Sequence, residues 1–314
     1  MNDTDSKTIE SVRFPMAVMV VAIHSYFTID GWSYTNIASY GIGSNVAQFF
    51  MISIGHVLAH IAVPTFFLVS GYLFFQRFGE GSLDVWKRKL KSRVSTLMIP
   101  YIVWIILYIL WKIGLSYQTV LQEGLINYLQ SLGGVKMFWC SSTWNLDRVD
   151  VWGNPAVASS PVLVPFWFMR NLIVCAFLAS PVFYFVFRRE TRWRVRSFSL
   201  VILAFLYFTQ TSLYLPGLSS STLFYFGIGA YLSLQDKSLI ETFSRHKQLL
   251  WILFCSLFIT EVALDGHNTT IGNIIYPFFV LAGVLSIINI TPLLVGGGNL
   301  RFSSLHFTLL FYQS

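Results

Sequence analysis

The sequence predicts an all-α protein, a polytopic bundle of transmembrane helices. Of the 314 residues, 55% are hydrophobic and only 11% are charged, and the mean hydropathy is +0.62. Soluble domains carry about a quarter charged residues, so this composition excludes an ordinary water-exposed surface. Apolar runs near the ~20 residues that cross a hydrocarbon core recur along the chain.

The apolar runs place about nine helices, eight of them complete. Residues 1–11 are expected to form a polar cytoplasmic tail and residues 12–314 a single membrane domain, because no linker, repeat or low-complexity tract divides them. Residues 302–314 are too short to span a membrane, so the last helix is incomplete or the protein is truncated. The helices are predicted at 12–30, 47–75, 96–113, 162–187, 197–213, 219–234, 247–264 and 271–290, with a ninth starting near 302.

The first helix carries two ionisable residues, Arg13 and His24. Their separation of eleven residues corresponds to about 16 Å and nearly three helical turns, so they share almost the same face. Ionisable groups inside a membrane are costly and mark functional sites. An imidazole titrates near neutrality and can take a proton from a hydroxyl. Arg13 can bind an anion or simply anchor the topology.

The charged residues predict the orientation of the helices. Most of the 21 Lys and Arg fall in alternate loops, chiefly 76–95, 188–196 and 235–247. Cytoplasmic loops carry such an excess, so the N-terminus is predicted to be cytoplasmic. The net charge of +7 therefore reports topology, and no nucleic-acid partner is expected.

The second and third helices carry the next candidate residues. Ser70 and Gly71 place a hydroxyl beside a close-approach position, although such small pairs also serve helix packing. Lys89, Lys91 and Arg93 come just before the third helix. This cluster can contact lipid headgroups or bind the phosphates of a cytosolic cofactor.

In the fourth helix, Arg170 lies about six residues inside the predicted outer end. The positive-inside bias does not account for it there, so it should face a cavity or a partner. With Trp167 it could hold an acceptor sugar, and pairing with an acid such as Glu261 is an equal alternative.

Metal binding is not predicted. His56 and His60 have a spacing that suits a metal, but no acidic or third ligand stands near them in sequence. The three cysteines, Cys140, Cys175 and Cys255, do not form a disulfide framework and are expected to be unpaired.

Taken in order, these motifs resemble the acyltransferase 3 family of bacterial integral-membrane acyltransferases. Arg13 and His24 are similar to the arginine and histidine of its first helix, and VPTFFLVSGYLFF (63–75) to its Ser-Gly motif. Residues 89–101 are similar to its basic stretch leading to Ile-Pro-Tyr. FWFMRNL (166–172) is similar to its Trp-Phe-x-Arg-Asp-Leu motif, but Asn171 stands where the motif has aspartate.

The resemblance implies about ten helices and transfer of an acyl group from acyl-CoA, commonly acetyl-CoA, to a glycan hydroxyl. It makes His24 the catalytic residue and Arg13 a donor-site contact. With them we group Ser70, Gly71 and Arg93 on the donor side, and Trp167 and Arg170 on the acceptor side.

The predicted function is therefore a membrane O-acyltransferase that modifies a cell-envelope polysaccharide or a lipid-linked sugar. Its predicted place is the bacterial inner membrane. A transporter or flippase for a glycan intermediate is the alternative from another class, although the paired repeats typical of transporters are not evident. An inactive, truncated acyltransferase is the third interpretation.

Overall fold

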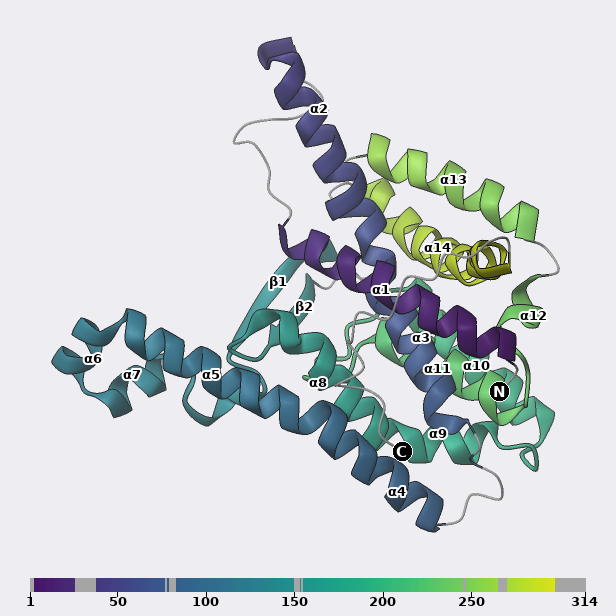
Figure 1. The fold of residues 1–314 in the computed structure, drawn as a ribbon, viewed down its shortest axis with the longest axis horizontal. Helices are drawn as coiled ribbons and strands as arrows, with labels where there is room; N and C mark the ends of the chain where they lie inside the picture. Colours follow the sequence, from purple (N-terminus) through teal and green to yellow (C-terminus); the bar gives the residue numbers. More distant parts are fainter. Residues whose placement is uncertain are drawn as a thin grey trace. The chain divides into compact units, whose positions relative to one another are not determined.

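The computed structural model describes residues 3–25, 38–76, 78, 83–149, 153, 155–244, 247–264 and 270–296. These residues are mostly helical, with one two-stranded hairpin, so the predicted all-α class is confirmed (Figure 1). They divide into two compact units. Unit 1 comprises residues 1–69 and 236–300, and unit 2 comprises residues 70–235 with 301–314.

In unit 1, helix α1 packs against the start of α3 and against α14. On α1, Val12 and Met16 are buried against Ala62, with Phe66 and Ile287 packed around them. The elements of this unit are α1 (Asp3–Ser25), α2 (Ile42–Phe50), a π-helical stretch (Met51–Val57), a 3₁₀ turn (Leu58–Ile61), the start of α3 (Ala62–Phe75), α12 (Leu239–Ser244), α13 (Lys247–Ala263) and α14 (Thr270–Gly296).

The first helix starts earlier than the sequence predicts. Residues 3–11, expected to be a polar tail, continue α1 without a break. The Asp5 carboxylate is buried and accepts hydrogen bonds from Ser238 Oγ at 2.9 Å and from the backbone N–H of Ile240 at 3.4 Å. The carboxylate thus binds the N-terminus of α12, where a negative charge is favourable.

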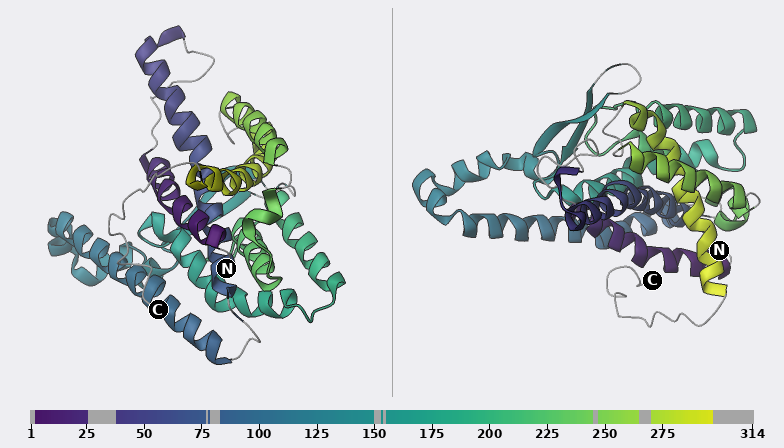
Figure 2. Two further views of the ribbon diagram at one scale, coloured as in Figure 1. Left: turned by 45° about the vertical axis from the view of Figure 1, so that its right-hand side comes forward. Right: turned by 90° about the horizontal axis from the view of Figure 1, so that it is seen from above.

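Unit 2 contains the last residues of α3, from Ser70 onward, and the elements up to Gln235. Its helices are α4 (Leu83–Arg93), a π-helical stretch (Val94–Met98), α5 (Ile99–Leu115), α6 (Tyr117–Glu123), α7 (Leu125–Ser131), a 3₁₀ turn (Gly134–Phe138), a 3₁₀ turn (Val164–Phe166), α8 (Trp167–Val174), a π-helical stretch (Cys175–Ala179), α9 (Ser180–Phe187), α10 (Trp193–Phe208) and α11 (Ser220–Leu234). Figure 2 shows α6 and α7 folded back beside the far end of α5. The Tyr128 hydroxyl holds that end by donating to the Lys112 carbonyl at 3.2 Å.

The hairpin lies between the predicted helices 96–113 and 162–187, in a segment where the sequence predicts no helix. Strand β1 (Ser142–Val149) pairs antiparallel with β2 (Pro155–Ser160), with Ser142 opposite Ser160. The hydroxyls of these two serines are 3.0 Å apart. The hairpin therefore closes the long segment at the point where it returns to the helices.

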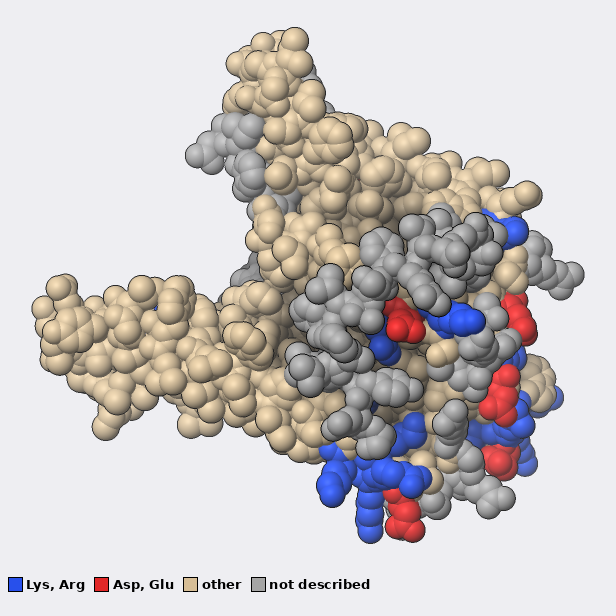
Figure 3. All heavy atoms as spheres, viewed as in Figure 1, with Lys and Arg blue, Asp and Glu red and all other residues tan. Residues whose placement is uncertain are grey.

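Four helical segments of the described residues are long and apolar enough to cross a membrane: Ile42–Phe75, Asp84–Leu115, Val164–Phe187 and Thr270–Asn289. Along α5, apolar side chains such as Val103, Trp104 and Leu110 are exposed, as expected for a surface that faces lipid. Basic side chains instead gather over α4, where Lys87, Arg88 and Lys91 are exposed (Figure 3). The predicted ninth helix lies outside the described residues.

Candidate active site

The two ionisable residues of the first helix both lie on α1, in unit 1. Arg13 sits near its middle and His24 in its last turn, and both side chains are exposed. At about 100° per residue they lie roughly 90° around the helix from the buried positions Val12 and Met16. One edge of α1 therefore carries a cation and an imidazole outside the packed face of its own unit.

The predicted donor-side residues of unit 2 meet at a narrow crevice. Its volume is about 10 Å³, which is room for one water molecule. The Arg93 guanidinium lies 5.8 Å from the centre of the Phe74 ring. The crevice is lined by Ser70, Phe74, Arg93, Leu97, Leu172, Ala176 and Phe226. Ser70 and Arg93 are thus brought together, while Arg13 lies in the other unit.

Gly71 has the packing role that the sequence offered as the alternative for the Ser70–Gly71 pair. A Cβ added at this position would stand 2.2 Å from the backbone oxygen of Phe226, in α11. Only a residue without a side chain lets α3 approach α11 this closely, as small residues do between helices in membranes. Gly71 therefore sets the distance between the helices that flank the crevice.

Arg170 is buried in α8 and uses its full set of donors inside unit 2. Its Nη1 donates to the Trp139 carbonyl at 2.7 Å and to Ser159 Oγ at 3.3 Å. Its Nη2 donates to the Ser159 carbonyl at 3.1 Å, and Nη2 and Nε donate to Asn171 Oδ1 at 3.1 and 3.3 Å. A guanidinium has five N–H donors, so these five bonds account for all of them.

These acceptors are neutral carbonyl, hydroxyl and amide oxygens. All of them belong to unit 2, whereas Glu261, the acid named as the alternative partner, belongs to α13 of unit 1, so its pairing with Arg170 stays a prediction. The contact of Arg170 with an acceptor sugar also stays a prediction, as does that of Trp167, which is half-buried at the start of α8.

Asn171 joins the Arg170 network to α11. While its Oδ1 accepts from Arg170, its Nδ2 donates to Thr222 Oγ1 at 3.2 Å. Thr222 in turn lies 2.7 Å from Ser219 Oγ, the N-terminal cap of α11. The residue that departs from the aspartate of the family motif therefore uses both ends of its amide.

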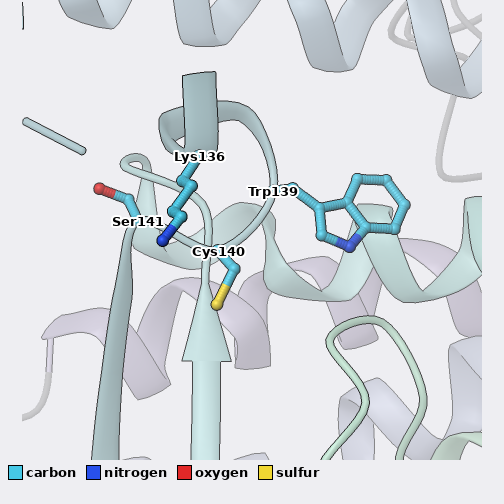
Figure 4. Close-up of a pocket in the computed structure, with 4 residues that line it drawn as sticks. All are labelled: Lys136, Trp139, Cys140 and Ser141. Carbon is cyan, nitrogen blue, oxygen red and sulfur yellow. The ribbon is translucent and has the colours of Figure 1, made fainter. Parts of the chain in front are cut away.

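A second pocket of unit 2 was not singled out by the sequence. It has a volume of about 410 Å³ and is lined by Lys136, Trp139, Cys140 and Ser141 (Figure 4). These residues lie in and after the 3₁₀ turn that precedes β1. A lysine in a segment predicted to be external, against the positive-inside bias, was the one available signal.

His56 and His60 lie together in unit 1. Their ring centroids are 5.8 Å apart, and the His60 ring lies 6.0 Å from that of Tyr276. Over the residues that the structure describes, no three His, Cys, Asp or Glu side chains form a group that could hold a metal.

A polytopic helical protein with a cation and an imidazole on one helix edge, and a basic helix beside a Ser-Gly pair, has the features that the sequence analysis found similar to membrane acyltransferases. The comparison with protein families makes this specific. The model described as an acyltransferase domain matches residues 7–310, and the chain therefore belongs to the acyltransferase 3 family. The predicted class of enzyme, an acyltransferase for groups other than aminoacyl, is confirmed at this level.

Among curated proteins, the chain is similar to the succinoglycan biosynthesis protein ExoH of Rhizobium meliloti (strain 1021). The two are 29% identical over 192 residues, which cover 58% of this chain and 43% of that protein. The match thus takes in less than half of the relative's length. No solved structure matches the chain.

The close approach at Gly71 predicts that Gly71→Ala is destabilising. The new methyl group would meet a backbone atom that no side-chain rotation can move, at a cost of about 1–3 kcal/mol. Gly114→Ala is the matched control, because a Cβ at Gly114 meets nothing within 4 Å. Thermal unfolding of both variants in detergent should show a lower Tm for Gly71→Ala alone, and equal Tm values would contradict the packing role.

The Arg170 network predicts opposite outcomes for two changes at Asn171. Aspartate keeps the oxygen that accepts from Arg170, and the Thr222 hydroxyl can turn to donate to it, so Asn171→Asp should unfold within about 1 kcal/mol of the parent. Asn171→Leu leaves buried donors unpaired and should cost about 1–3 kcal/mol. Thermal melts of the two purified variants test this, and a leucine variant as stable as the parent would refute it.

Proposed function

We propose that the protein is a membrane O-acyltransferase that moves an acyl group, specifically acetyl, from acyl-CoA to a hydroxyl of an envelope polysaccharide or lipid-linked sugar. Family membership over residues 7–310 carries the acyl-transfer part. The name of the similar protein, a succinoglycan biosynthesis protein, supports a polysaccharide acceptor.

In this proposal His24 is the general base. Its imidazole nitrogen removes the proton of the acceptor hydroxyl while that oxygen attacks the thioester carbonyl carbon. The carbon–sulfur bond then breaks, and the departing CoA thiolate takes the proton back from the imidazolium. The support is chemical: an imidazole can both accept and return a proton, and His24 lies exposed at the end of α1 rather than in the core of its unit.

The donor would enter from the cytoplasm. Lys87, Arg88 and Lys91 are exposed on α4, and Arg93 follows them at the crevice beside Ser70. Such a cluster suits the phosphates of CoA. Because the crevice holds only about one water, an acyl-CoA arm would have to displace the Phe74 ring or the Arg93 side chain that closes it. Arg13 would add a further contact to the donor.

The proposed place is the bacterial inner membrane, with several spans and a cytoplasmic N-terminus. This orientation puts the basic α4 on the side where acyl-CoA is made. It puts the segment between α5 and α8 on the side where envelope glycans are modified. A membrane-embedded enzyme would thereby join a cytosolic donor to an external acceptor.

The catalytic role of His24 predicts that His24→Ala abolishes acyl transfer. A positioned general base contributes about 10²–10⁴-fold, so transfer should fall by at least the lower figure. Membranes carrying the variant would be given radiolabelled acetyl-CoA, and label in the envelope polysaccharide measured. Val21→Ala, an exposed change one turn earlier, is the control and should leave transfer unchanged. Undiminished transfer by His24→Ala would remove the histidine from the mechanism.

The donor role of Arg13 predicts a defect in binding rather than in chemistry. Loss of one cationic contact to a phosphate should raise the Kd for acetyl-CoA about tenfold. Titration of purified Arg13→Ala with acetyl-CoA by isothermal calorimetry measures this directly. Arg189→Ala, which also removes one exposed arginine from the predicted cytoplasmic side, is the charge-matched control. An equal Kd in the two variants would contradict the donor-binding role of Arg13 and leave it only the role of a topology anchor.

A further inference from the structure

The pocket lined by Lys136, Trp139, Cys140 and Ser141 lies in unit 2, and the proposed function gives it no role. Its volume of about 410 Å³ falls in the range of small-molecule sites. In Figure 4 the Lys136 ammonium and the Cys140 sulfur both point downward, and the Trp139 indole extends to the right of them.

The pocket has a rigid backbone. Three consecutive carbonyls, those of Met137, Phe138 and Trp139, each accept a hydrogen bond from a different element. The donors are Val162 N at 2.8 Å, the Tyr101 hydroxyl, and Arg170 Nη1 at 2.7 Å. The next strand is held too, because Ser141 N donates to the Ser160 carbonyl at 2.8 Å. A site on a backbone held in this way needs little ordering when a ligand binds.

The indole of Trp139 is presented as a platform. A Cβ at Gly217, which has φ of +95°, would lie 3.4 Å from Trp139 Cζ2, so the ring edge rests against a glycine turn. Trp139 remains 39% exposed to solvent. A flat aromatic surface with one polar edge suits the apolar face of a sugar ring.

The electrostatics of the pocket favour an anion. Lys136 is exposed, and none of the four lining residues is acidic. Behind the pocket, Arg170 binds the Trp139 carbonyl, and its five hydrogen-bond partners are neutral. The neutral Asn171 thus leaves the buried guanidinium charge uncompensated by these contacts. Two positive charges act on the pocket, although only Lys136 can touch a ligand.

We infer that this pocket is the acceptor subsite for an acidic glycan, with a sugar ring on Trp139 and a sugar carboxylate at Lys136. The inference rests on the proposed function and gives its acceptor a chemical class. Lys136 and Trp139 are positioning residues, because the reacting atoms lie elsewhere. Asn171 tunes the same site through the charge of Arg170.

The thiol of Cys140 allows a binding test that does not depend on turnover. The protein carries Cys255→Ser, which removes the exposed thiol, while Cys175 is buried. The rate of Cys140 labelling by N-ethylmaleimide is measured in detergent, with oligosaccharides from the source cell's envelope polysaccharide. A second portion of the same oligosaccharides is used after chemical reduction of its carboxylates to alcohols.

The native oligosaccharides should slow labelling about fivefold more than the reduced ones. Lys136→Ala should remove this difference, Asn171→Asp should reduce it, and Lys136→Arg should keep it. Lys112→Ala makes the same charge change outside the pocket and should behave like the parent. Equal protection by the two portions, no protection by either, or an unchanged difference in Lys136→Ala would each overturn the inference.

Failure of the proposed function would look different. In that case wild-type membranes would transfer no label from acetyl-CoA to the polysaccharide, whatever the protection of Cys140. Transfer that proceeds equally well to native and reduced polysaccharide would leave the acyltransferase in place and remove only the acidic subsite.

Discussion

The part of unit 2 around the hairpin depends on one buried charge, the guanidinium of Arg170. Burying such a group costs several kcal/mol unless its hydrogen bonds are satisfied. Arg170 meets that condition with acceptors from separate parts of the chain, at Trp139, Ser159 and Asn171. The same bonds that keep the cation buried therefore hold the turn before β1 and the end of β2 against α8. Through Asn171 and Thr222 they also reach the start of α11.

Close packing governs the opposite part of unit 2. In lipid, helices gain little from the hydrophobic effect, so contact between backbones takes its place. Gly71 allows that contact with Phe226, and Phe74 of the same helix then closes the crevice against Arg93. One glycine thereby decides how narrow the predicted donor-side crevice is. The proposed entry of acyl-CoA consequently requires side chains to move, because the helices are already in contact.

The helices were predictable because their signal is local. Hydropathy placed the segments 162–187 and 247–264 within two residues of Val164–Phe187 and of α13 (Lys247–Ala263). A close backbone approach at Gly71 was predicted, but its partner, Phe226, was not, because that residue lies far along the chain. The hairpin was not predicted for a similar reason, because strand β1 is held by its pairing with β2, which lies further along the chain.

For the candidate site, too, the sequence selected residues by type but did not predict their contacts. Residue type and spacing were enough to select Arg13, His24 and Arg170, because charge inside an apolar run is conspicuous in sequence. Residue type and spacing could not show that the Arg170 guanidinium donates its hydrogen bonds to neutral oxygens, because these acceptors come together only in the folded protein. Lys136 was overlooked because a lysine in a polar segment is unremarkable until Trp139 and Cys140 are found around the same opening.

The proposed orientation also explains why Lys136 and Arg170 are informative. Basic residues on the cytoplasmic side are expected from insertion alone, so Lys87 or Arg88 needs no ligand to account for it. Lys136 and Arg170 oppose that bias, and for Arg170 the carbonyls of the turn before β1 supply the structural reason. Lys136 is exposed and lines a pocket, so stability alone does not explain it. In the proposed orientation this positive charge lies on the external side, beside an aromatic platform and a neutral Asn171, which fits the negatively charged acceptor that we infer.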